Sequence, residues 1–166
     1  MISTRAMTEA DLGAVLAIQA ECYGPAMNET RETVLARLRA FPHTAWVAHD
    51  TQGACAYLVA YESRLGRVTA LGGDFRRSER ADSLYLHDLA VSPRAKGRGA
   101  GRLLVEQALQ QARHAGLAHS CLVSVQDSQA FWRSFGYEPR LELPAESQPA
   151  LQTYGPGACY MARAIA

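Results

Sequence analysis

Residues 84–104, LYLHDLAVSPRAKGRGAGRLL, decide the fold of this chain. An apolar run predicts a strand, the following Ser-Pro pair predicts a turn, and the apolar periodicity after the last glycine predicts a helix. Between turn and helix, three glycines alternate with three basic residues: Lys96, Gly97, Arg98, Gly99, Gly101 and Arg102. Because glycine has no Cβ, the amides of such a loop can close around an anion, and the first N–H groups of the helix are unpaired. The stretch therefore predicts a strand, a turn, a phosphate-binding loop and a helix.

The spacing argues against the two common nucleotide loops. A nucleotide P-loop needs Lys and then Ser or Thr after its last glycine, whereas Arg102 and Leu103 follow Gly101. A dinucleotide-binding loop needs a glycine three positions after Gly99, and Arg102 stands there. A glycine-rich surface turn with solvated arginines is the alternative to a phosphate site.

Two segments resemble the GNAT superfamily of N-acyltransferases. Val91-x-Pro93 followed by KGRGAG at 96–101 resembles the acyl-CoA loop of the family, with Lys96 in place of the usual Gln or Arg. Since the loop of the family binds pyrophosphate largely through backbone amides, this replacement leaves the implied site in place. The segment AFWRSFGY at 130–137 is similar to the Ala-Phe-Tyr-three residues-Gly-Phe end of these domains.

The resemblance implies acetyl-CoA as a co-substrate. In the family, the strand before the loop splays from its neighbour, and its free backbone groups pair with the pantetheine arm. The N–H of Leu89 is then the donor that faces the oxyanion. The residues implied in binding acetyl-CoA are Leu89, Ala90, Val91, Lys96, Gly97, Arg98, Gly99, Ala100, Gly101, Arg102 and Trp132.

Length and composition predict one compact enzyme domain over residues 1–166. A chain of 166 residues with 48% hydrophobic content can bury a single sizeable core. A formal net charge of +1 argues against a nucleic-acid partner, since phosphate-tracking surfaces need a clustered excess of Lys and Arg. Four cysteines without a CxxC pair make a metal site improbable.

The termini and apolar segments predict a cytoplasmic protein with no membrane partner. Glu9 and Asp11 interrupt the first apolar segment, so the sequence lacks a signal-peptide pattern, and no later run is long enough to span a bilayer. The cysteines fit a reducing compartment. We expect a monomer or a homodimer.

The order of predicted elements matches the GNAT fold, an α/β (α+β) class. Strands are expected at 2–6, 44–49, 54–61, 84–91, 120–125, 137–143 and 158–164, and helices after Thr8, after Asn28, at 101–115 and at 128–135. The resemblance implies a mixed, mostly antiparallel central sheet of six to seven strands, flanked by about four helices and splayed at the acyl-CoA site.

The residue most suited to be the catalytic base is His87, because the unperturbed pKa of imidazole lies near neutrality. Residues 86–91 resemble the His-containing strand of the arylalkylamine (serotonin) N-acetyltransferases, where paired histidines draw protons from the amine through water. His87 matches one of them, and Tyr85 stands where the other would be. The alternative for His87 is a packed, hydrogen-bonded residue. Tyr85 has two open roles, positioning of substrate or water and simple packing. Regular strand alternation places Tyr85 and His87 on one face and Asp88 on the other.

Trp132 is the clearest departure from the family. The usual acid is the Tyr of Ala-Phe-Tyr, and an indole N–H cannot deliver a proton to the leaving thiolate. Another hydroxyl protonates the sulfur, or water does, or the thiolate leaves unprotonated, since a thiol has a pKa of only about 8.5. Tyr85 is the first hydroxyl candidate, and Trp132 is expected to pack against the pantetheine arm.

The sequence indicates less about the acceptor substrate than about the cofactor. Glu21 and Tyr23, at the end of the first helix, lie where the family shapes its acceptor site and could receive a cationic aromatic amine; a solvated helix end is the alternative. Residues 62–81 form a connection long enough to be a lid. Residues 148–157 could form the opposite wall or a surface loop.

We therefore expect an acetyl-CoA-dependent N-acetyltransferase that acts directly on a primary amine, with a small-molecule amine as substrate. The alternatives are a protein N-terminal or lysine acetyltransferase and a non-catalytic acyl-CoA-binding sensor. A closed pocket under residues 62–81 favours a small amine, and an open groove favours a polypeptide.

Overall fold

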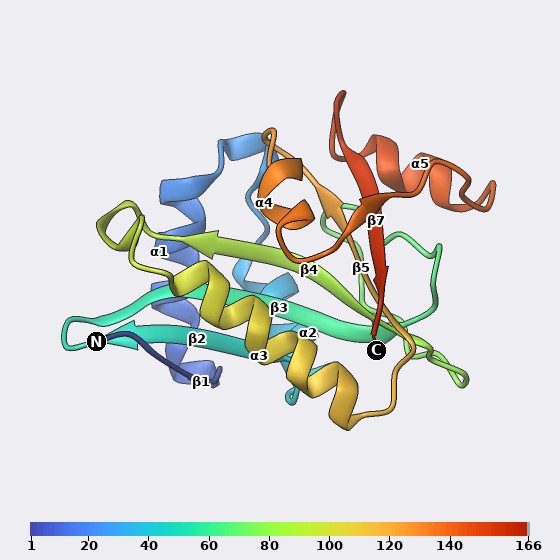
Figure 1. Cartoon of the computed structure of the whole chain (residues 1–166). Helices are drawn as coiled ribbons and strands as arrows, with labels where there is room; N and C mark the ends of the chain where they lie inside the picture. Colours follow the sequence, from blue (N-terminus) through green and yellow to red (C-terminus); the bar gives the residue numbers. More distant parts are fainter. Residues whose placement is uncertain (166) are drawn as a thin grey trace.

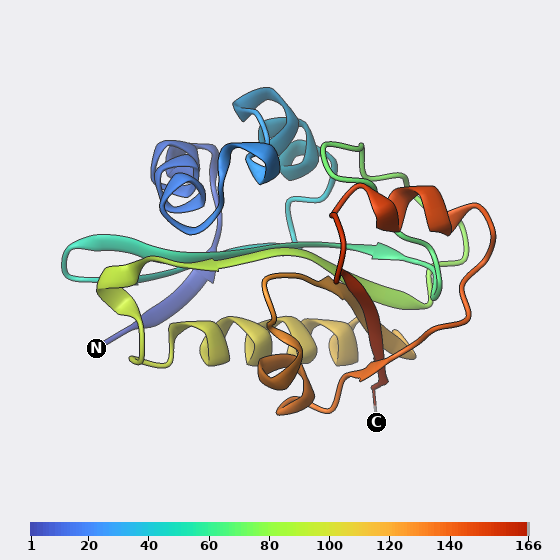
Figure 2. The same ribbon diagram turned by 90° about the horizontal axis from the view of Figure 1, so that it is seen from above.

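The computed structural model describes residues 1–165 as one mixed sheet with helices on both faces (Figures 1 and 2). The strands are β1 (Ser3–Ala6), β2 (Ala45–Asp50), β3 (Gly53–Ser63), β4 (Ser83–Val91), β5 (His119–Ser124), β6 (Glu138–Pro139) and β7 (Cys159–Ala164). The helices are α1 (Leu12–Cys22), α2 (Arg31–Ala40), α3 (Ala100–His114), α4 (Gln129–Arg133) and α5 (Ser147–Gln152).

The seven strands are ordered β1-β2-β3-β4-β5-β7-β6. All neighbours are antiparallel except β4 and β5, which are parallel. The expected mixed sheet of six to seven strands is confirmed. Two details differ: β6 is only two residues long in place of the predicted 137–143, and α5 was not predicted. Pro139 has no N–H to donate to a ladder, which limits β6.

Helices cover both faces of the sheet. Figure 2 shows α1 and α2 on one face with α3 and α4 on the other. Along α3, buried residues recur at helical spacing, and Leu104 is fully buried. Leu103, the next residue toward the start of the helix, is 37% exposed. Gly116 follows α3 with a φ of 72°, the left-handed conformation that commonly ends helices.

A bulge in β4 changes which side chains share a face. Val59 of β3 pairs with Asp88, and the next residue, Ala60, pairs with Leu86, so His87 is an extra residue in β4. Beyond the bulge the alternation is shifted by one position. The expectation that Asp88 faces away from Tyr85 is therefore wrong, because the Asp88 carboxylate accepts a hydrogen bond from Tyr57, on the face covered by α1 and α2.

Within residues 1–165, no helix combines the length and apolar character that a membrane crossing needs.

Removing side-chain volume at Leu104 tests the packing of α3. We expect Leu104→Ala to lower the free energy of unfolding by about 2–5 kcal/mol, because it leaves a cavity under the helix. Leu103→Ala, one position away and partly exposed, serves as the control and should cost less than about 1 kcal/mol. Urea denaturation monitored by circular dichroism measures both. Equal losses for the two variants would contradict the observed orientation of α3.

Candidate active site

A pocket opens where β4 and β5 separate. The two strands pair only between Ser83–Leu86 and His119–Leu122, and beyond this point they diverge. The gap holds a pocket of about 260 Å³, which we call the splay pocket. Its lining residues are Tyr23, Leu86, His87, Leu89, Val91, Val123, Val125, Gln126, Ser128, Phe131 and Trp132.

The free edge of β4 presents backbone groups to this gap. The Leu89 carbonyl accepts a hydrogen bond from Tyr23 Oη at 2.9 Å, and the Val91 carbonyl accepts one from Cys22 Sγ at 3.2 Å. In an antiparallel ladder the N–H and C=O of one residue point to the same edge, so the N–H of Leu89 also faces the gap. Ala90 pairs with Tyr57 of β3 and turns its backbone groups away from the gap, unlike its two neighbours.

The glycine loop has the conformation of an anion-binding site. Gly97 and Gly99 have φ values of 78° and 83°, which a side chain would strain. Between residues 97 and 102, the N–H of Arg98 donates to the Ala95 carbonyl at 3.2 Å. The other five N–H groups of this span have no acceptor among the described residues; they belong to Gly97, Gly99, Ala100, Gly101 and Arg102. A Cβ on Gly101 would lie 3.4 Å from Cζ of Phe131 and 3.5 Å from Cγ2 of Val91. The loop thus fits a pyrophosphate group, held mainly by backbone amides at the start of α3.

The basic side chains of the loop are mostly engaged elsewhere. Arg94 and Arg98 each donate to Asp50 Oδ2 at 2.9 Å. Arg102 lies over the Phe135 ring, 4.9 Å from its centroid. Lys96 is exposed. Arg98 and Arg102, which were expected to bind the cofactor through the resemblance, thus have protein partners for their side chains.

Trp132 is 7% exposed and lines the splay pocket. Its ring meets Tyr137 edge-on, with centroids 5.7 Å apart. The hydroxyl-bearing residues that line the splay pocket are Tyr23 and Ser128. The Ser128 hydroxyl donates to the Val125 carbonyl at 2.7 Å.

A second, narrower pocket adjoins the first and is called here the acceptor pocket. Its volume is about 30 Å³, and its lining residues are Tyr23, Met27, Glu29, Leu71, His87, Asp88, Val123, Val125 and Tyr154. Tyr23, His87, Val123 and Val125 line both pockets. Two carboxylates line the acceptor pocket: Glu29 forms an ion pair with Arg37, and Asp88 accepts hydrogen bonds from the hydroxyls of Tyr23 and Tyr57. Asp88 is therefore the group in this pocket that suits a cationic ligand.

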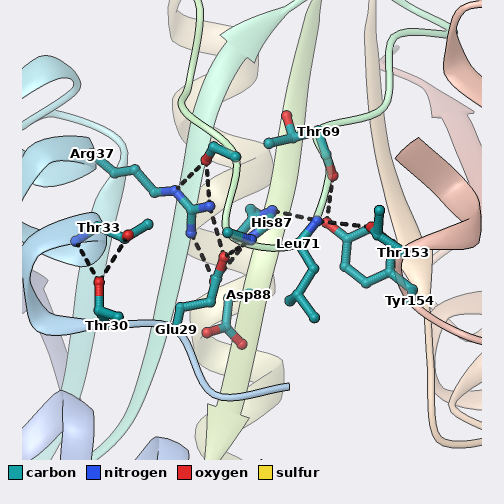
Figure 3. Close-up of polar contacts among 12 residues, drawn as sticks. Glu29, Thr30, Thr33, Arg37, Thr69, Leu71, His87, Asp88, Thr153 and Tyr154 are labelled. Atoms are coloured by element: carbon teal, nitrogen blue, oxygen red, sulfur yellow. Dashed lines mark hydrogen bonds and ion pairs between the residues drawn. The ribbon is translucent and has the colours of Figure 1, made fainter. Parts of the chain in front are cut away.

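His87 lies in a buried polar network (Figure 3). Its side chain is 1% exposed, its Nε2 lies 3.0 Å from Glu29 Oε1, and its Nδ1 lies 3.4 Å from Tyr154 Oη. Glu29 also accepts hydrogen bonds from Arg37 at 2.7 Å and from the N–H of Gly72 at 2.7 Å. Since the Glu29 carboxylate is only an acceptor, Nε2 carries the proton and Nδ1 keeps its lone pair in neutral His87.

The Glu29 carboxylate is held in its charged form. Burial raises its pKa, but the hydrogen bonds from His87 and Arg37 and the charge of Arg37 outweigh burial and leave the pKa well below its ordinary value. Sequence reasoning missed Glu29, which lies in a connection without a recognisable motif. Arg37 gave a usable signal, because it interrupts the apolar face of α2 formed by Val34 and Leu38.

Of the residues expected in catalysis or in acceptor binding, Tyr85 and Glu21 line neither pocket. Tyr85 is buried in the core beside Tyr61, with ring centroids 5.7 Å apart. Glu21 is exposed and accepts a hydrogen bond from Ser92 Oγ at 3.1 Å, next to the start of the glycine loop. Tyr23, in contrast, lies between the two pockets. No group of three or more His, Cys, Asp or Glu residues in the described chain is placed to hold a metal ion.

Comparison with known proteins identifies the family. The model of the Acetyltransferase (GNAT) family matches residues 14–137, and the chain belongs to this family. Among curated proteins, no sequence matches. The family match supports the superfamily and does not single out the arylalkylamine branch.

Solved structures share the whole fold at low sequence identity. The loading GNATL domain of CurA from Lyngbya majuscula has a TM-score of 0.78 and 14% identity, covering 99% of this chain and 98% of that chain. The ribosomal-protein-S18-alanine N-acetyltransferase from Escherichia coli has a TM-score of 0.68 and 16% identity, covering 100% and 95%. The GNAT family N-acetyltransferase YhbS from Escherichia coli, in complex with CoA, has a TM-score of 0.66 and 20% identity, covering 99% and 82%. The protein is thus a GNAT acetyltransferase that acts with CoA.

A negative charge in the glycine loop tests the pyrophosphate site. We expect Gly99→Glu to abolish CoA binding in calorimetry, because the carboxylate repels the pyrophosphate and the new Cβ strains a left-handed position. Gly116→Glu is the matched control: Gly116 also has a positive φ, and a Cβ added there would meet open space, but it lies at the other end of α3. Unchanged CoA affinity in Gly99→Glu would contradict the assignment of the loop.

The buried pair of Glu29 and Arg37 predicts how stability depends on pH. The lowered pKa of Glu29 in the folded state contributes stability above its unfolded pKa of about 4.3, and this contribution is lost as the pH falls. Glu29→Gln should cost about 3–5 kcal/mol at neutral pH, since it leaves Arg37 unpaired, and the difference from wild type should shrink below about pH 4.

Denaturant titrations between acidic and neutral pH measure this difference. Glu32→Gln, at an exposed position of α2, serves as the control and should stay within about 0.5 kcal/mol of wild type. A difference for Glu29→Gln that grows with acidity would show that the sign is wrong.

Proposed function

We propose that this enzyme transfers an acetyl group from acetyl-CoA directly to the primary amine of a small molecule in a ternary complex. The observation that carries the proposal is the junction of the two pockets at Tyr23 and His87. The splay pocket adjoins the glycine loop and suits the acyl-pantetheine arm, and the acidic acceptor pocket suits an ammonium group. An amine in one pocket then meets a thioester in the other.

The lid over the acceptor pocket favours a small amine over a polypeptide. Residues 64–82, which connect β3 to β4, form this lid. The lid is held by hydrogen bonds on two sides. On one flank, Glu29 accepts from the N–H of Gly72, and Arg37 donates to the Gly73 carbonyl at 3.1 Å. On the other, the N–H of Leu71 donates to Thr153 Oγ1 at 2.9 Å (Figure 3). A polypeptide acceptor, such as the peptide bound to the NatC complex, remains the alternative.

His87 is the proposed catalytic base. Its Nε2–H is held by Glu29, which leaves Nδ1 to accept a proton, directly or through water. The N–H of Leu89, at the free edge of β4, is the proposed oxyanion donor. Tyr85 lies outside both pockets, so packing is the role we propose for it.

The cellular setting in the proposal is the cytoplasm. Cys22, Cys55, Cys121 and Cys159 are all free thiols in the described chain, which suits a reducing compartment.

An amine panel with acetyl-CoA and thiol detection tests the proposal. We expect acetylation of small cationic amines and a decrease of about 10²–10⁴-fold in kcat/KM for His87→Ala, the range of general acid–base catalysis. His87→Gln, which keeps a donor for Glu29, should lose the same activity with less effect on melting temperature. His114→Ala, on the exposed end of α3, is the control.

Two outcomes separate the alternatives. Full kcat/KM in His87→Ala at neutral pH would show that another group is the base. Tight CoA binding without acetylation of any amine or peptide would identify a non-catalytic acyl-CoA sensor.

A further inference from the structure

The replacement of the usual tyrosine by Trp132 leaves the leaving thiolate without the acid of the family. Two hydroxyl groups line the splay pocket, and both are donated to protein acceptors. The Ser128 hydroxyl donates to the Val125 carbonyl, which has no proton to return. The Tyr23 hydroxyl donates to the Asp88 carboxylate, which can carry a proton and replace the one that Tyr23 gives to the sulfur. Tyr23 comes from the end of α1, far in sequence from Trp132.

Tyr23 connects the two pockets through one hydrogen-bonded carboxylate. Its hydroxyl lies 2.9 Å from Asp88 Oδ1 and 2.9 Å from the Leu89 carbonyl oxygen. Asp88 lines the acceptor pocket, where the amine is proposed to bind. The other carboxylate oxygen, Oδ2, accepts from Tyr57 at 2.7 Å, and Tyr57 lines neither pocket.

We propose that Asp88 and Tyr23 form a proton relay from the amine in the acceptor pocket to the leaving sulfur in the splay pocket. The proposal rests on the transferase function proposed above. It assigns to Tyr23 the role of general acid, which the indole of Trp132 cannot fill. Asp88 and Tyr23 are then catalytic residues, whereas Tyr57 positions the Asp88 carboxylate.

The hydrogen bonds are complete in both protonation states of the relay. When Asp88 is ionised, the hydroxyls of Tyr23 and Tyr57 donate to its two oxygens. When Asp88 carries a proton, it donates to the oxygen of Tyr23, and Tyr23 turns its own proton to the Leu89 carbonyl. Because no buried polar group loses its partner, the proton can reside on Asp88 without the cost of an unpaired group.

Burial prepares both groups for transfer. It raises the pKa of Asp88 above its ordinary value, against the lowering effects of His87 and of the tyrosine hydroxyls. It also raises the pKa of Tyr23 well above its ordinary value, so Tyr23 gives up its proton only as Asp88 replaces it. The titratable groups that face Asp88 are Cys22 of α1, Tyr23 directly after α1, Tyr57 of β3, His87 of β4, and Glu29.

The transfers balance. Asp88 takes one proton from the ammonium group, breaking an N–H bond and forming an O–H bond. As the C–S bond breaks, Tyr23 gives its proton to the sulfur, which keeps the electron pair of that bond, and Asp88 returns its proton to the oxygen of Tyr23. The second proton that the nitrogen loses passes to His87 and then to solvent. The products are an amide, a thiol and one released proton.

Two matched variants test the relay. Tyr23→Phe and Tyr57→Phe each remove one hydroxyl that donates to Asp88, but only Tyr23 reaches the splay pocket. We expect Tyr23→Phe to lower kcat by about 10²-fold or more with little change in the KM for acetyl-CoA, as loss of a general acid predicts. Tyr57→Phe should keep most of its kcat. Equal kcat in the two variants would overturn the proposal.

A second measurement does not depend on turnover. The thiol of bound CoA is titrated by the ultraviolet absorbance of its thiolate in wild type, Tyr23→Phe and Tyr57→Phe. A shifted thiol titration in Tyr23→Phe alone supports contact between the Tyr23 hydroxyl and the sulfur, and identical titrations in all three proteins overturn it. If the wild type acetylates no amine, the proposed function fails, and this titration still decides whether Tyr23 meets the sulfur.

Discussion

The site depends on the separation of two parallel strands. β4 and β5 share only the pairing that ends at Leu86 and Leu122, and β5 then leaves through a turn at Gln126 and Asp127, which have φ values of 52° and 56°. Such left-handed conformations in non-glycine residues are costly and cluster at functional sites. The separation frees the backbone of β4 at Leu89, and it opens the space that the aromatic side chains of α4 border. Because α3 begins only nine residues after β4 ends, the same stretch of chain supplies both the free strand edge and the amides of the glycine loop.

Much of the fold follows from local sequence patterns. The stripe of Leu104, Ala108 and Ala112 and the left-handed Gly116 define α3, and these features are visible without any tertiary information. The end of the chain was less predictable. Pro149 argues against a helix in an apolar segment, yet it lies within the first turn of α5, where the missing N–H has no intrahelical partner.

The position of the glycine loop between β4 and α3 was predictable from the sequence, and most contacts of the acceptor pocket were not. Glu29 and His87 are 58 residues apart, and the sequence holds no sign that they meet. The β-bulge at His87 is equally hidden, because it depends on the register between β3 and β4. Regular strand alternation predicted that Tyr85 and His87 lie on one face of the strand and that Asp88 lies on the other. Tyr85 and His87 do lie on the same side, with ring centroids 6.2 Å apart, but Tyr85 is buried in the core. The extra residue brings Asp88 to the acceptor pocket.

Glu29 and Asp88, the two carboxylates that line the acceptor pocket, have different electrostatic roles. Glu29, the carboxylate beside His87, is neutralised by Arg37, so it fixes the imidazole without adding net charge to the pocket. Asp88 has hydroxyl partners only, and its charge is therefore the one that an incoming ammonium group can neutralise. When a proton moves from the ammonium to Asp88, both charges disappear together. The electrostatic attraction that binds the ammonium group to Asp88 therefore ends when the nitrogen becomes a nucleophile. In the proposed relay, the same carboxylate both binds the amine and activates it.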